Sequence, residues 1–98
     1  MNINAISEGN VCTLIISGRI DTITAPELDK VFRENAEVCE KMIFDMSEVD
    51  YISSAGIRSL VAAHRKMAGK GGLVLRGLNK SVLSILEMTG LSKKLNIE

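Results

Sequence analysis

Apolar residues along the chain alternate with polar ones near the amino terminus and form short continuous runs further on. The alternation at 2–5, a turn-rich tetrad at 7–10 and a β-branched run at 11–17 predict a β-hairpin. Gly18 is expected to end its second strand, and 19–23 to form a loop. Short apolar runs predict three further strands, the last at a sheet edge, at 41–46, 73–75 and 95–97.

Between these runs, apolar residues recur at three- and four-residue steps, which is typical of amphipathic helices. Thr24 and Glu27 match a capping box, and Pro26 suits the first turn of the first helix. The expected helix starts are Thr24, a residue near Ala55, and Asn79 or Ser81. The apolar faces consist of Leu28, Val31, Phe32 and Ala36, then Ile57, Leu60, Val61, His64, Met67 and Ala68, then Val82, Ile85, Leu86 and Met88.

The order ββαβαβα(β) indicates one α/β domain over residues 1–98. Strands that alternate with helices imply right-handed crossovers and a mostly parallel sheet, which here opens with an antiparallel hairpin. We therefore expect a mixed sheet of four to five strands with about three helices. Functional groups in such sheets gather in loops beyond the carboxyl ends of the strands, here 18–22, 47–56 and 76–79.

Charge and composition narrow the function. Twelve Lys and Arg balance twelve Asp and Glu, and aromatic residues make up 3% of the chain. Nucleic acid is not an expected partner, because its binding needs a positive field or aromatic platforms. No apolar leader and no apolar stretch near ~20 residues is present, so we expect a cytoplasmic protein without membrane insertion.

The remaining reactive side chains are scattered along the sequence. Cys12, Cys39 and His64 lack the clustering of a zinc site, so no metal or cofactor is expected, and each cysteine is best explained as a buried hydrophobe. The cluster of His64, Arg65, Lys66 and Lys70 is interpreted as a solvated helix face. The methionines interpreted as core residues are Met42, Met46, Met67 and Met88.

The most unusual stretch is 45–56, where carboxylates, hydroxyls and a glycine lie between a buried strand and an apolar-striped helix. Ser53 or Ser54 could simply cap this helix through its hydroxyl. The same position would also accept a phosphate, because a helix start offers free N–H groups and a partial positive charge. Gly56 is expected to keep the first turn free of side chains, so that another protein can approach the backbone.

Enzymatic alternatives fit less well. His64, the only histidine, lies roughly 15 Å from Ser54 along a helix with ~1.5 Å rise per residue, too far to act as its base. The phosphate-binding and nucleophile-elbow motifs are missing. Asp45 stands where an aspartyl phosphate would form, at the expected end of a parallel strand, but lacks the acidic pair that would hold magnesium.

The stretch 44–57 resembles the signature of the STAS domain of bacterial anti-sigma factor antagonists. The opening hairpin, the segment 18–21 and the segment 86–91 also fit, so the resemblance covers essentially the whole chain. It implies a non-enzymatic protein that binds an anti-sigma factor with GHKL-type serine kinase activity. That kinase would phosphorylate the domain and lower its affinity, and a metal-dependent serine phosphatase would reverse the change.

Alignment on Gly56 puts the family's phosphoacceptor at Ser54 and its loop aspartate at Asp21. Ser53 stands where the family usually has Asp, which makes it a second-choice acceptor, and Ala55 stands where Ser or Thr is common. The chain also ends without the terminal helix of many relatives, which would leave sheet surface less covered and allow weak homodimers. The expected partner-binding residues are Asp21, Thr22, Ser53, Ser54, Gly56, Ile57 and Arg58.

Three other functions stay open from the sequence. The same fold serves as an unphosphorylated scaffold or as a subunit of stress-signalling or lipid-transport complexes. A nucleotide-binding protein and a receiver phosphorylated at Asp45 are the remaining alternatives. For Arg58, contact with the partner and neutralisation of a phosphate on Ser54 are both expected roles.

Overall fold

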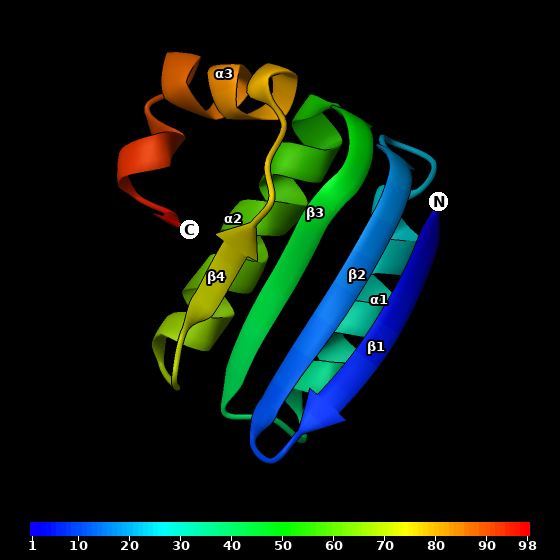
Figure 1. Ribbon diagram of the computed structural model, residues 1–98, viewed down its shortest axis with the longest axis vertical. Coiled ribbons are helices and arrows are strands. Elements are labelled where there is room, and N and C mark those ends of the chain that lie inside the picture. The colour runs from blue at the N-terminus through cyan, green and yellow to red at the C-terminus, as the bar shows by residue number, and fades with distance from the viewer.

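The computed structural model describes residues 1–98 and contains one five-stranded mixed sheet. The strands lie side by side in chain order, with β1 antiparallel to β2 and every other neighbouring pair parallel (Figure 1). The predicted mixed sheet with an antiparallel opening hairpin is therefore confirmed. The strands are β1 (Asn2–Glu8), β2 (Val11–Ile20), β3 (Lys41–Ile52), β4 (Leu73–Arg76) and β5 (Asn96–Ile97).

Two helices cover one face of the sheet. In Figure 1, α1 (Ala25–Ala36) and α2 (Ser54–Ala68) lie next to each other behind the strands. The shorter α3 (Lys80–Met88) crosses beyond the tip of β4, and a 3-10 turn, η1 (Leu91–Lys93), leads from it to β5. None of the helices is long and apolar enough to cross a membrane.

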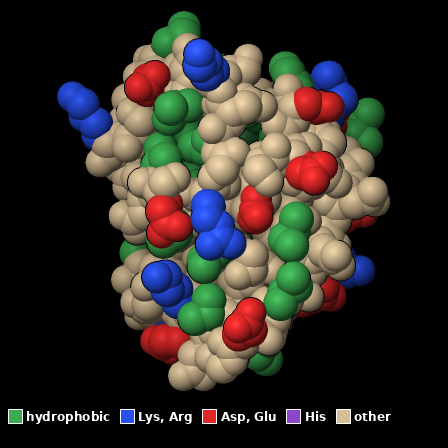
Figure 2. Space-filling view, viewed as in Figure 1, with side chains coloured by type: hydrophobic (Ala, Val, Ile, Leu, Met, Phe, Trp, Pro, Cys, Tyr) green, Lys and Arg blue, Asp and Glu red, His purple; other side chains and the backbone are tan.

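The core lies between the sheet and these helices. Strand residues of one parity, such as Leu14 and Phe44, are buried beneath α1 and α2, as the two-residue period of a strand requires. Phe32 of α1 meets Phe44 edge-on, with ring centroids 6.1 Å apart. The opposite face has no helix over it, and Figure 2 shows charges of both signs interspersed there with apolar side chains.

The two cysteines are buried and free, as predicted. Although far apart in sequence they are neighbours in space, and burial beside Cys12 raises the pKa of the Cys39 thiol to about 11. Of the four methionines predicted for the core, Met42, Met46 and Met67 are buried, but the prediction for Met88 is wrong, because it ends α3 with 83% of its surface exposed. Lys70 is exposed as predicted, but it lies beyond the end of α2, and its ammonium donates to the carbonyl of Ala36 at the end of α1.

Strands β2 and β3 are both longer than predicted. They stay paired as far as Ile20 and Ile52, so residues 19–20 of the expected loop at 19–23 and residues 47–52 of the expected connection at 47–54 are strand. The ladder shifts register between Ile15 and Ser17 and again between Gly18 and Arg19. Bulges of this kind let a strand continue while its inward-facing residues change spacing, so polar residues that interrupt the strand pattern do not end the strand here.

Candidate partner-binding site

The site forms where β3 ends and α2 begins. Ser53 is extended, and its backbone N–H donates to the carbonyl of Ile20 at 2.8 Å, which ties this point to the end of β2. Its hydroxyl accepts from the N–H of Gly56 at 3.4 Å. Of the two serines proposed as caps, Ser53 is therefore the N-cap.

Ser54 is the first residue of α2. Its side chain is exposed and its hydroxyl forms no hydrogen bond within the protein. The hydroxyl is therefore reachable from solvent beside the unpaired N–H groups of the first turn. A phosphate there would meet the positive end of the helix dipole.

Gly56 faces the interior, so the expectation that it opens the backbone to a partner is wrong. A Cβ at this position would lie 2.6 Å from Ile52 Cγ1, 2.8 Å from Ile20 Cγ2 and 3.0 Å from the Ile20 carbonyl oxygen. Glycine is needed because the first turn of α2 packs directly on the ends of β2 and β3. Gly56 thereby fixes the position of the neighbouring Ser53 and Ser54.

The loop between β2 and α1 is held by Asp21. Its Oδ1 accepts from the N–H groups of Ile23 and Thr24, both at 3.0 Å. These bonds, the Thr24 N–H first, hold the pKa of the Asp21 carboxyl below its ordinary value despite some desolvation. The loop is therefore pre-shaped, and it presents Ile23 with 86% of its surface exposed.

The predicted capping box of α1 is wrong. The Thr24 hydroxyl points back along the chain, donates to the carbonyl of Arg19 at 2.8 Å and accepts from the N–H of Asp21 at 2.9 Å. Thr24 makes no side-chain cap, and its backbone is helical rather than extended. Asp21 supplies the carboxylate that satisfies the free N–H groups ahead of the helix.

Two residues outside the predicted set complete this end of the sheet. Arg19 pairs with Tyr51 across β2 and β3, and its guanidinium lies 4.2 Å from the centre of the Tyr51 ring. Its Nε also lies 3.6 Å from Asp21 Oδ2. The sequence alone does not predict this pair, because Arg19 and Tyr51 become neighbours only when β2 and β3 are paired to their ends.

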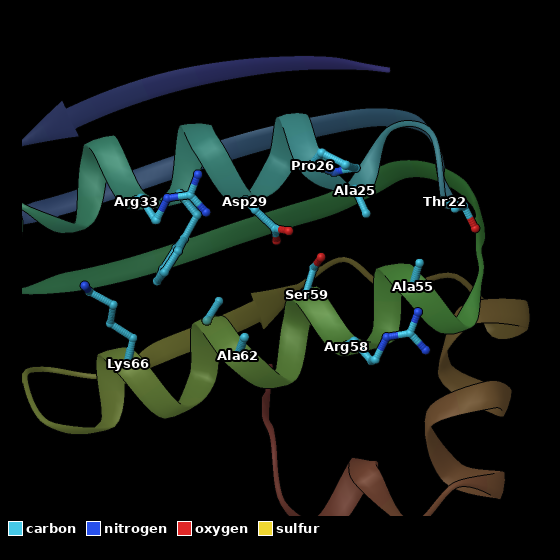
Figure 3. Close-up of a pocket in the computed structure, with 12 residues that line it drawn as sticks. Thr22, Ala25, Pro26, Asp29, Arg33, Ala55, Arg58, Ser59, Ala62 and Lys66 are labelled. Carbon is cyan, nitrogen blue, oxygen red and sulfur yellow. The ribbon is translucent and has the colours of Figure 1, made fainter.

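A groove of about 580 Å³ runs between α1 and α2 and opens next to the site. Thr22, Ala55 and Arg58 line its end nearest the Asp21 loop, and Figure 3 shows side chains of both helices facing each other across it. Ser59 and Phe32 form part of its floor. Sequence patterns did not indicate this groove, because its two walls are far apart along the chain.

The structure thus brings most of the predicted residues to one end of the molecule. Ser53 is bonded to Ile20, the residue before Asp21, and Ser54 and Arg58 are exposed on the first turns of α2. Ile57 is only half-buried and packs against the core. Gly56 could contribute to binding only indirectly, by positioning its neighbours.

Asp45 is not at the end of a strand, so the premise of the receiver alternative is wrong. It lies within β3, and its Oδ1 accepts from the hydroxyl of Ser47 at 2.8 Å and from the Ser47 N–H at 3.1 Å. These two bonds lower the pKa of the Asp45 carboxyl. The extension of β3 to Ile52 moves the strand end seven residues away from it.

Fold and site together define a small α/β domain that displays a serine at a helix start on the carboxyl edge of a mixed sheet. The family model for the STAS domain matches residues 2–98, and the chain belongs to this family. The anti-sigma-B factor antagonist of Listeria monocytogenes is 32% identical over 88 residues, which cover 87% of this chain and 76% of that protein.

Solved structures share the fold. An anti-sigma factor antagonist from Mycobacterium paratuberculosis superposes with a TM-score of 0.89 at 24% identity, covering 98% of this chain and 83% of that one. The anti-sigma factor antagonist SpoIIAA matches in its unphosphorylated form with a TM-score of 0.77 at 8% identity, covering 99% of this chain and 87% of that one. The phosphorylated form of SpoIIAA, from Bacillus, matches with a TM-score of 0.76 at 10% identity, covering 99% of this chain and 91% of that one.

Proposed function

We propose that this chain is an anti-sigma factor antagonist whose binding is switched by phosphorylation of Ser54. In its unphosphorylated form it binds an anti-sigma factor with GHKL-type serine kinase activity and so releases a sigma factor. The kinase then modifies Ser54 and the complex dissociates, and a serine phosphatase restores binding. The relatives named as anti-sigma factor antagonists support the binding part of this proposal.

The exposed hydroxyl of Ser54 is the observation that carries the phosphorylation part. It needs no hydrogen bond to be broken before a kinase can reach it. A phosphate adds about −1.5 to −2 charge to a surface that also contains the Asp21 loop and the mouth of the groove. A partner that docks here would lose contacts by desolvation and by charge.

Ser53 is the weaker acceptor of the two. Its oxygen accepts from the Gly56 N–H, and its side chain is half-buried. Modification of this oxygen would remove the N-cap of α2. The preference for Ser54 over Ser53 is therefore a prediction with a structural reason.

The test compares Ser54→Ala with Ser54→Asp. Each variant is titrated with the purified GHKL-type kinases encoded in the source genome, and the dissociation constants are measured by calorimetry. We expect Ser54→Ala to keep wild-type affinity, and Ser54→Asp to lose about tenfold or more, since charge is added to the contact surface. Phosphorylation with ATP should modify wild type and not Ser54→Ala, as read by mass spectrometry.

Ser81 provides the matched control. It is an exposed serine in the first turn of another helix, α3, so Ser81→Asp adds the same charge near the start of a helix. Ser81→Asp should bind like wild type. Equal affinities of Ser54→Ala and Ser54→Asp would refute the switch and leave an unphosphorylated scaffold, and binding to none of the kinases would refute the partner class.

A further inference from the structure

Helix α2 carries only positive charge. Between Ser54 and Ala68 it contains Arg58, Arg65 and Lys66 but no Asp or Glu. The whole chain has a formal net charge of zero, and the open sheet face mixes both signs (Figure 2). The positive charge is therefore a local property of the helix that begins at Ser54.

The groove between α1 and α2 gathers part of this charge. Arg58 and Lys66 line it from α2 and Arg33 lines it from α1, while Asp29 is the only acidic residue among its walls (Figure 3). The only ion pair of the molecule within 4.0 Å joins Arg19 to Asp21, outside the groove. All three groove cations are exposed and have no carboxylate partner within the protein.

The surface between these cations includes small and apolar side chains beside the polar Ser59 and the acidic Asp29. Ala55, Ala62 and Ala63 come from α2, and the nearly buried Phe32 comes from α1. Small side chains let another backbone come close, which is how an amphipathic helix is held in a groove between helices. Unpaired cations at the rim then select an acidic occupant.

We propose that this groove binds an acidic amphipathic helix of the anti-sigma factor, an inference that rests on the proposed function and names the partner's contact element. The apolar face of that helix lies on Ala55, Ala62 and Phe32, and its carboxylates face Arg33, Arg58 and Lys66. Arg58 and Lys66 are eight residues apart, which is about 12 Å along the helix. The partner should therefore carry acidic residues about two turns apart.

This arrangement gives the switch a direction. Ser54 and Arg58 are four residues apart and so lie on the same side of α2. A phosphate on Ser54 stands beside the cation that the acidic helix uses, pairs with it and repels the incoming carboxylates. Phosphorylation therefore opposes an acidic partner, whereas it would attract a basic one.

A pair of synthetic peptides tests the groove without the natural partner. Both are amphipathic helices with the same Leu and Ala face, one with Glu and one with Lys at two rim positions two turns apart. In an NMR titration, the Glu peptide should shift the amide signals of Ala55, Arg58, Ala62 and Lys66 in a saturable way, and the Lys peptide should not. Equal shifts from both peptides, or shifts elsewhere, overturn the proposal, as does saturable binding of phosphatidylglycerol vesicles at these residues in place of the Glu peptide.

Charge reversal then tests the groove against the kinase. Lys66→Glu and Arg33→Glu change groove residues, and Arg65→Glu changes the adjacent cation on α2, which does not line the groove. We expect each groove variant to weaken kinase binding about three- to tenfold, less so at high salt, and Arg65→Glu to have a smaller effect. If Lys66→Glu and Arg65→Glu lower the affinity equally while Ser54→Asp still lowers it about tenfold or more, the groove assignment fails and the proposed function stands.

Discussion

Replacing Gly56 by alanine gives the most direct test of how the site is positioned. The added Cβ would stand 2.6 Å from Ile52 Cγ1 and 2.8 Å from Ile20 Cγ2, whereas ordinary contact begins at about 3.4 Å. Neither isoleucine can turn aside freely, since Ile20 is 0% and Ile52 2% exposed. The added Cβ would also lie only 3.0 Å from the Ile20 carbonyl oxygen. The first turn of α2 must therefore move away from the sheet.

Two effects of opposite sign determine how far Gly56→Ala changes the free energy of unfolding. Overpacking of a buried site costs about 1–3 kcal/mol, and replacing glycine by alanine within a helix gains up to about 1 kcal/mol. The free energy of unfolding should therefore fall by roughly 1–2 kcal/mol. For a chain of this size, that corresponds to a decrease in Tm of about 4–16 °C.

Gly69 is the matched control, because it follows the last turn of the same helix. A Cβ there meets nothing closer than 3.8 Å, and its φ of −78° suits any residue. Thermal and urea unfolding, followed by circular dichroism, should show Gly69→Ala at least as stable as wild type. If Gly56→Ala is as stable as Gly69→Ala, α2 is not held by close contact with β2 and β3.

Two further predictions concern the helix cap at Ser53 and the hydrogen-bonded carboxyls of Asp21 and Asp45. Ser53→Ala removes the N-cap and should lower the free energy of unfolding by about 1 kcal/mol, whereas Ser54→Ala should change it by less than about 0.5 kcal/mol; urea unfolding that shows the opposite order would exchange the roles of the two serines. The carboxyls of Asp21 and Asp45 have pKa values below their ordinary 3.8, so the stability they contribute is present above that pH and is lost as the pH falls through their lower folded values. Asp21→Asn and Asp45→Asn should each flatten the acid limb of a plot of urea midpoint against pH, and an unchanged limb would show that these bonds do not form in solution.

The fold was predictable because its main signals are local and repeated. Alternation gave the hairpin, three- and four-residue steps gave the helices, and Asn79 caps α3 through the Val82 N–H as expected. The lengths of β2 and β3 were not predictable in this way. Ser47 and Glu48 read as a loop, but the irregular pairing with β2 carries the strand past them to the buried Val49 and Ile52.

The parts of the site that escaped prediction depend on contacts across the fold. Glu27 is correctly spaced for a capping box, yet Thr24 bonds backward to Arg19, because Asp21 already occupies the free N–H groups. Likewise, the sequence shows that residue 56 is a glycine but not that Ile20 lies against it. Local spacing predicts which side chains could cap a helix or position the site, and only packing across the fold determines which of them do so.

The same contacts bear on how the proposed switch would work. Three hydrogen bonds hold the carboxyl edge of the sheet. The Thr24 N–H donates to the Asp21 carboxylate, and the Ser53 N–H donates to the carbonyl of Ile20. The side-chain amide of Asn79 donates to the carbonyl of Val49 at 2.8 Å. A phosphate on Ser54 breaks none of these bonds, because the Ser54 hydroxyl takes part in none of them. In the proposed mechanism the domain therefore keeps its shape, and the partner responds to a change of charge at the start of α2 rather than to a change of conformation.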